Sequence, residues 1–272
     1  MRRKLMAIFL AAAGNGAAAR LSPSAGRVFN SYVLEVEARL GRQHADVGSY
    51  VAAFDDNPAL RGRSETRAAS GEIFTERVNE GTRQLDGALL HHWRADTLAP
   101  NVTAKEMLAV LDGFHQWSGQ YAQDVVSSRV LARAGDTTTL VVRFKKQVVI
   151  TIVLDAEYKI ESRLTRADRG YSFSRGMHFW QVDHAGTAHE RRRPEGQDDG
   201  YLWRLNSYWS FAQLNDGLAI ECEAVSLTRD VPAGFGWLIM PIVSDLPREL
   251  LTSTMASVKN ALVARTSGEA SR

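Results

Sequence analysis

The side chains in this sequence that are suited to metal chemistry are its histidines, of which there are seven. His91 and His92 are adjacent in a strand-like stretch, where neighbouring side chains point to opposite faces, so the two cannot bind one metal ion. His178, His184 and His189 have no recognised ligand spacing, and the single cysteine offers no Cys pair to accompany them. We therefore predict no metal site and no cofactor.

Nucleophilic catalysis has little support either. The stretch Gly-Tyr-Ser-Phe-Ser at 170–174 lacks the final glycine of a nucleophile elbow and lies among predicted strands. Cys222 stands between Glu221 and Glu223, whose charges disfavour the thiolate and indicate a structural thiol. The Gly-Phe-Gly at 234–236 lacks the third glycine of a dinucleotide motif.

A role in catalysis or recognition stays open for three titratable residues and one arginine. An enzyme would need a group such as His115, His92 or Asp230 inside a cavity with a shifted pKa. The simpler interpretation of His115 is that it lies at the end of a helix and does not border a cavity. Asp230 can cap a following helix, while Arg229 either reaches the polar head group of a ligand or only fixes the strand-to-helix corner.

The composition is that of a globular protein. The 272 residues are 44% hydrophobic and 8% aromatic, with 33 Lys and Arg against 31 Asp and Glu. These values exclude disordered, collagen-like and disulfide-stapled classes. The net charge of +2 is too small and too scattered for a nucleic-acid-binding face, so we predict no nucleic-acid partner.

The N-terminus has the features of a secretory signal peptide over residues 1–19. Three basic residues precede an apolar stretch at 5–13, and an Ala-rich segment at 17–19 supplies the cleavage site. This predicts a periplasmic or secreted protein. No later apolar run reaches the length of a membrane span, so we expect at most peripheral contact with a membrane.

The rest of the chain divides into three predicted parts. Residues 20–69 form an N-terminal helix, with apolar residues spaced at three and four over 27–40, and an extended connector. Residues 70–265 form the main domain, and residues 266–272 a polar tail. The helix could pack on the main domain or, if its apolar stripe stays exposed, dock a partner protein.

Strand-like alternation dominates the main domain. A capping box of Thr103 and Glu106 begins one helix, over 103–111. The remaining candidates, bounded by turn signals, are strands. They are 73–78, 89–97, 125–133, 139–144, 148–154, 158–164, 171–182, 201–214 and 218–227.

The Asn-Asp-Gly turn at 215–217 fixes the register of the last hairpin. A two-residue turn places Trp209 opposite Cys222 and Phe211 opposite Ile220. These side chains then share an inward face. The alternate residues, Glu221 and Glu223 among them, point outward, because a slip of one residue would bury the carboxylates.

The chain ends in helical sequence. Apolar residues three and four apart predict a long amphipathic helix over 247–264, preceded by a shorter piece at 235–240. Pro241 and Pro247 are expected to kink or divide the two.

Three segments of the C-terminal third resemble secreted bacterial members of the START-like (SRPBCC, helix-grip) superfamily. They are Tyr-Leu-Trp-Arg-Leu-Asn-Ser-Tyr-Trp at 201–209, Glu-Cys-Glu-Ala-Val-Ser-Leu-Thr-Arg-Asp-Val-Pro at 221–232 and Gly-Phe-Gly-Trp-Leu at 234–238. The resemblance spans about residues 70–265. It implies an α+β fold in which a curved antiparallel sheet wraps around a long C-terminal helix and encloses an apolar tunnel.

Members of this superfamily bind or move lipids and other hydrophobic molecules, and a minority are cyclases or hydrolases. We therefore expect an exported protein that binds a hydrophobic small molecule or lipid between the sheet and the last helix. The alternative is a cyclase- or hydrolase-type enzyme using the same cavity, although no catalytic residue carries over. The candidate ligand-binding residues are Trp203, Trp209, Phe211, Phe144, Trp237, Met255 and Arg229.

Overall fold

The computed structural model describes residues 20–46, 50–52, 72–113, 118, 124–147, 151–215, 217–230 and 236–269, with the side chains of the last helix described over 245–265. The predicted signal peptide, most of the connector after residue 46, and His115 lie outside this part. The elements in chain order are α2 (Pro23–Ala45), β1 (Phe74–Leu85), β2 (Ala88–Ala99), α5 (Ala104–Leu111), β3 (Val125–Ala134), β4 (Thr137–Gln147), β5 (Thr151–Arg166), β6 (Arg169–Asp183), β7 (Arg191–Arg192), β8 (Arg204–Leu214), β9 (Gly217–Arg229) and α7 (Gly236–Glu269).

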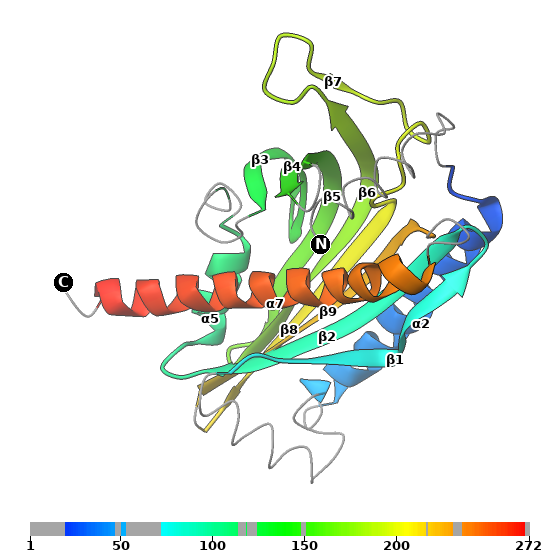
Figure 1. The fold of residues 1–272 in the computed structure, drawn as a ribbon. Helices are drawn as coiled ribbons and strands as arrows, with labels where there is room; N and C mark the ends of the chain where they lie inside the picture. The colour runs from blue at the N-terminus through cyan, green and yellow to red at the C-terminus, as the bar shows by residue number, and fades with distance from the viewer. Residues whose placement is uncertain are drawn as a thin grey trace.

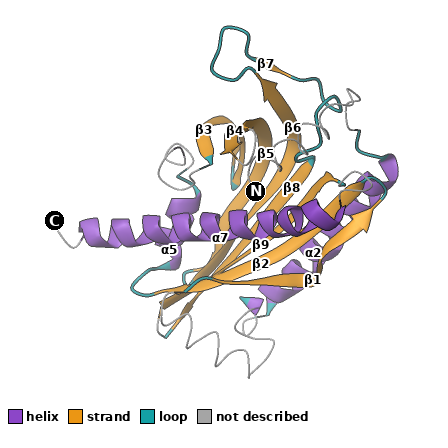
Figure 2. Ribbon diagram, viewed as in Figure 1, coloured by secondary structure: helices purple, strands orange, loops and turns teal. Residues whose placement is uncertain are grey.

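The strands form one antiparallel sheet in the order β1-β2-β9-β8-β6-β5-β4-β3, with β7 paired to β6. The sheet curves around α7, which lies across one face, while α2 lies against the other (Figure 1). Helices therefore cover both sides of the sheet (Figure 2). We refer to the two sides as the α7 face and the α2 face. The α+β class and the sheet wrapped around a C-terminal helix are confirmed.

The register of the last hairpin is as predicted. Trp209 pairs with Cys222 and Phe211 with Ile220. All four pack with Met255 of α7 in one buried cluster on the α7 face. The pattern of alternation therefore identified correctly which side chains share a face.

The expectation that the opposite side chains point into solvent is wrong. Glu221 and Glu223 are 1% and 0% exposed, because α2 covers them. The apolar stripe of α2, which includes Phe29, Val36 and Leu40, is buried against this face. That stripe is not available to dock a partner protein, and among the described apolar residues of α2 only Leu34 is strongly exposed, at 68%.

Three interruptions that the sequence predicts in strands and helices are not present. The turn signal at 79–81 is a bulge inside β1, where Asn79 and Gly81 adopt positive φ and the register shifts. The two strands expected at 148–154 and 158–164 are one strand, β5, from residue 151 onward. The last helix runs from Gly236 to Glu269 without division at Pro241 or Pro247. Each proline removes only one backbone hydrogen bond from this long helix.

The capping box at the start of α5 is confirmed. Thr103 accepts from the backbone N–H of Glu106, and the Glu106 carboxylate accepts from the backbone N–H of Thr103 at 2.7 Å. Among the described helices, none is both long and apolar enough to cross a membrane.

Candidate functional site on the α7 face of the sheet

A row of residues crosses the middle of the α7 face, with three small side chains between a tryptophan and an isoleucine. Successive strand pairs place five residues of β2, β9, β8, β6 and β5 side by side: Trp93, Ala224, Ser207, Ser174 and Ile160. Ser207 and Ala224 are part-exposed, although β8 and β9 are central strands. A closely packed face would bury central residues completely. Solvent therefore reaches the sheet at this row, which we call the small-residue row.

The helices on this face explain why the row stays accessible. α7 packs against β1, β2 and β9, and α5 packs against β5, β6 and β8. The row crosses from the strands under one helix to the strands under the other. Its alanine and serine side chains are short, and the two helices leave Ser207 and Ala224 part-exposed.

Two aromatic rings flank the row where it crosses β6. A Cβ atom on Gly176 would lie 2.5 Å from the ring of Phe179, and one on Gly170 would lie 2.8 Å from the ring of Phe211. Both glycines are therefore required by the close approach of a ring. Between them, Ser174 presents only a small polar side chain to this face.

Tyr158 lies beside the row on β5 and is 4% exposed. Its ring makes edge contacts with Phe144 and Phe179, at centroid distances of 6.4 and 5.8 Å. Burial raises the pKa of its hydroxyl, which therefore stays protonated.

A carboxyl group reaches this face at the end of α5. The Ser162 hydroxyl donates to Asp112, and Ser162 Oγ lies 2.7 Å from Ser172 Oγ. Burial raises the pKa of Asp112, and this effect outweighs the opposing hydrogen bond from Ser162. Asp112 could not be singled out from the sequence, where only its position after a capped helix marks it.

The structure brings together some of the predicted ligand-binding residues. Trp209, Phe211 and Met255 are in the buried cluster under α7. Phe144 packs at the edge of a neighbouring cluster around Tyr158.

Two of the other predicted residues lie elsewhere, and the side chain of the third is not described. Trp203 packs with α2 on the opposite face and donates from Nε1 to Asp198 at 3.0 Å. Arg229 ends β9, where its backbone N–H donates to Gly200. Trp237 is in α7, but its side chain lies outside the described residues.

The candidate catalytic residues do not gather on the α7 face. His92 lies on the α2 face, and Asp230 accepts a hydrogen bond from Gln84 near the surface. His91 points the opposite way from His92 and contacts Thr82 and Thr228 through its two ring nitrogens, at 3.0 and 3.1 Å. Within the described ranges, no three His, Cys, Asp or Glu side chains are arranged to hold a metal ion.

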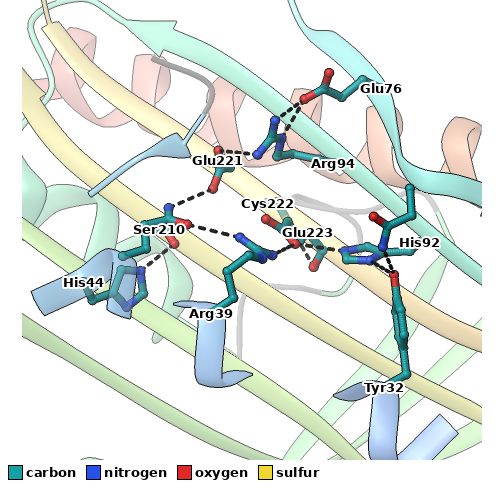
Figure 3. Close-up of polar contacts among 12 residues, drawn as sticks. Tyr32, Arg39, His44, Glu76, His92, Arg94, Ser210, Glu221, Cys222 and Glu223 are labelled. Carbon is teal, nitrogen blue, oxygen red and sulfur yellow. Dashed lines mark hydrogen bonds and ion pairs between the residues drawn. The ribbon is translucent and has the colours of Figure 1, made fainter. Parts of the chain in front are cut away.

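The α2 face carries a buried polar network, shown in Figure 3. Glu223 Oε2 accepts from Arg39 of α2 at 2.5 Å and lies 2.8 Å from His92 Nε2. The other ring nitrogen of His92 lies 2.8 Å from the hydroxyl of Tyr32, which also accepts from Asn79 at 2.8 Å. Despite burial, the hydrogen bond and charge of His92 and the charges of Arg39 and Arg94 lower the pKa of Glu223 to about 2.

A second arm of the network surrounds Glu221. Gln43 of α2 donates to Glu221 at 3.4 Å, and Arg94 lies 3.9 Å from it while also binding Glu76 (Figure 3). Asp96 is buried nearby, and burial raises its pKa to about 7. In this arm the hydrogen bond from Gln43 to Glu221 attaches α2 to the sheet.

The order Glu223, His92, Tyr32 resembles an acid–base relay, but its electrostatics do not favour catalysis. Burial raises the pKa of Tyr32, so its hydroxyl is a poorer nucleophile than an ordinary tyrosine. His92 and Glu223 are almost fully buried, at 1% and 0% exposure, and bonded to protein groups. The network is therefore best explained as the attachment of α2.

A pocket of about 350 Å³ lies on the outside of the molecule, between the start of α2 and the segment before β8. Its walls include Leu21, Phe179 and Trp203, together with the charged residues Arg20 and Glu195. Trp203 therefore lines this outer pocket instead of the α7 face.

The sheet order, the curvature of the sheet and the position of α7 decide the fold. The chain has a START-like, helix-grip fold. No protein-family model and no curated protein sequence matches the chain.

Solved structures with similar folds include human STARD10, with 10% sequence identity, a TM-score of 0.45 and coverage of 80% of this chain and 84% of that one. The Zhui aromatase/cyclase from Streptomyces sp. R1128 has 9% identity and a TM-score of 0.44, over 65% and 93% of the two chains. A STAR-related lipid transfer protein from Xanthomonas axonopodis has 15% identity and a TM-score of 0.41, over 66% and 99%. These similarities concern the helix-grip fold alone and assign no ligand or reaction to this chain.

Proposed function

We propose that this protein binds a hydrophobic small molecule or lipid on the α7 face of its sheet, over the small-residue row. The observation that supports the proposal most strongly is the part-exposure of Ser207 and Ala224 on central strands. Around them are buried aromatic and aliphatic side chains, including Trp209, Phe179 and Met255. Covering this surface with an apolar molecule would contribute affinity in proportion to the area buried.

The predicted ligand-binding residues have different positions in the proposed site. Trp209, Phe211 and Met255 would form the wall under α7, and Phe144 the wall near Tyr158. Trp237 is proposed for the end of the site near the start of α7, whereas Arg229 is not included, because it shares the face of β9 that carries Glu223 and pairs with Ala88 of the α2-face cluster. Trp203 is not included, because it packs against α2.

Native mass spectrometry of the protein purified from its own host tests the proposal. We expect a fraction of molecules to carry one added mass of a few hundred daltons, which denaturation and organic extraction release. Protein that is always free of added mass, and that also fails to bind any apolar probe, would contradict it.

An enzyme of the cyclase or hydrolase type is the second candidate, and Asp112 is the observation that favours it. With a raised pKa, its carboxyl could donate a proton to a ligand through the hydroxyls of Ser162 and Ser172. An enzyme would convert a bound substrate, and replacing Asp112 by Asn would abolish turnover without abolishing binding. A pure binding protein would release its ligand unchanged.

We also propose that residues 1–19 direct export, which their charge and hydrophobicity support. Cell fractionation and N-terminal sequencing of the mature protein test this. A first residue at or near position 20 in the exported fraction is expected. An intact N-terminus in the cytoplasmic fraction would contradict it.

A further inference from the structure

Two polar atoms on the α7 face are buried without a partner. Within the part of the chain that the structure describes, the indole Nε1 of Trp93 and the hydroxyl of Tyr158 have no hydrogen-bond partner. Both residues are 4% exposed. A buried donor left unpaired keeps the full cost of its lost hydration, so native proteins seldom retain one without a reason.

The two residues stand at the two ends of the small-residue row. Trp93 is its last member on β2, and Tyr158 is on β5, two residues from Ile160 and on the same face. Four strand spacings separate β2 from β5, or about 19 Å along the curved sheet. Short side chains alone occupy the positions between them, so no protein group from the row reaches either donor.

The chemistry of the two groups limits what can satisfy them. An indole N–H can only donate, and a phenol that stays protonated also offers a hydrogen. A hydrocarbon would leave both unsatisfied. A carboxylate is disfavoured as well, because burying an ionised group without a charged partner costs far more than a hydrogen bond to a neutral donor returns.

From this geometry we infer that the ligand is a mainly apolar molecule carrying a neutral acceptor oxygen, such as a carbonyl, and that one of the two unpaired donors, Trp93 or Tyr158, binds that oxygen. This inference rests on the proposed binding function and specifies its ligand class. Recognition of this kind would separate oxygenated ligands from hydrocarbons of the same shape.

Binding of the matched probes 9-fluorenone and fluorene, which differ mainly in one carbonyl group, tests the inference by titration. We expect the wild-type protein to bind 9-fluorenone about five- to tenfold more tightly, the contribution of about one net hydrogen bond. The double variant Trp93→Phe/Tyr158→Phe should bind both probes equally, with its affinity for fluorene little changed. The single variants then show which donor binds the carbonyl.

The stability of the free protein provides an independent readout. Tyr158→Phe should leave the melting temperature unchanged or raise it, because it removes an unpaired hydroxyl. Tyr208→Phe is the matched control. Its hydroxyl is bound to Asn206 at 2.9 Å and to Glu37 at 3.1 Å, so its loss should lower the melting temperature.

The outcomes separate the two proposals. If both probes bind wild-type protein with equal affinity, the ligand-class inference is wrong and the binding function stands. If Tyr158→Phe destabilises the free protein as much as Tyr208→Phe, the hydroxyl has a partner inside the protein and the inference is also wrong. If neither probe binds, the proposed binding function fails, and the inference fails with it.

Discussion

At the scale of single residues, burial determines the charge states on the α2 face. Asp96 has no hydrogen-bond partner at Oδ1 among the described residues, and its pKa rises from 3.8 to about 7. A glutamate on the neighbouring strand, Glu223, has its pKa lowered to about 2 by His92 and Arg39. The pKa values of two carboxyl groups on the same face are therefore shifted in opposite directions.

Replacing Asp96 by Asn should stabilise the protein at alkaline pH. The folded carboxyl keeps its proton up to about pH 7, whereas the unfolded one loses it near 3.8, so wild-type stability falls as pH rises between these values. We expect Asp96→Asn to gain about 1–3 kcal/mol at pH 8 and little at pH 4, measured by urea unfolding. An equal effect at both pH values would show that Asp96 does not titrate in this range.

His91 should make the fold sensitive to mild acid. Burial lowers its pKa from 6.5 to about 4, so the unfolded state binds a proton that the folded state rejects between these values. Stability should therefore fall as pH drops from 6.5 to 4, by about 2–3 kcal/mol from this residue. A His91→Gln variant should show a shallower decline over the same range. An unchanged slope would contradict this account of His91.

At the scale of elements, α2 is attached through buried charge as well as through apolar packing. Arg39 reaches Glu223 from α2, and its side chain is 36% exposed while that of Glu223 is 1% exposed. Removing the arginine would leave a buried carboxylate with only His92 as its close partner. Such a loss costs more than the pair contributes, because the remaining charge stays desolvated.

Arg39→Ala should therefore lower the free energy of unfolding by about 2–4 kcal/mol. Arg42→Ala, an exposed arginine on the same helix, is the matched control and should change it by less than about 0.5 kcal/mol. Chemical unfolding at neutral pH measures both. Similar small effects for the two variants would mean that the Arg39 pair is as weak as a surface ion pair.

Much of the fold could be predicted from local signals. The Asn-Asp-Gly turn limits the hairpin to one register, so the pairing of Trp209 with Cys222 followed from spacing alone. The burial of Glu221 and Glu223 could not be predicted this way. A carboxylate in a strand normally indicates a solvated face, and only contact with α2, almost 200 residues away in the chain, reverses that.

The candidate site was predicted less well than the fold. Trp203 was assigned to the interior because it is aromatic, but it precedes β8 and turns to the α2 face. The alignment of Ser174, Ser207 and Ala224 could not be predicted, because it depends on the pairing of β6 with β8, two strands that are separated in the sequence by β7. Trp93 and Tyr158 had no sequence signal, because an unpaired donor is visible only in three dimensions.

At the scale of the whole molecule, the two faces of the sheet have different roles. The α2 face is packed and its described charges are mostly paired, whereas the α7 face keeps part-exposed small residues on its central strands. We expect the first face to determine stability and the second to accept the ligand. On any one strand, a substitution on the α2 face should therefore lower stability, and a substitution on the α7 face should weaken ligand binding.

The most direct test of this division is to add the same bulk to each face of β8. Ser207→Phe enlarges a part-exposed residue of the small-residue row, and Ser210→Phe enlarges a fully buried residue bonded to His44 on the α2 face. Thermal unfolding and titration with the neutral apolar probe N-phenyl-1-naphthylamine would be measured for wild type and both variants. We predict that Ser207→Phe retains the wild-type melting temperature and loses at least tenfold in probe affinity, while Ser210→Phe loses stability by about 1–3 kcal/mol. If Ser207→Phe destabilises the fold as much as Ser210→Phe, or binds the probe as tightly as wild type, the α7 face is not the binding site.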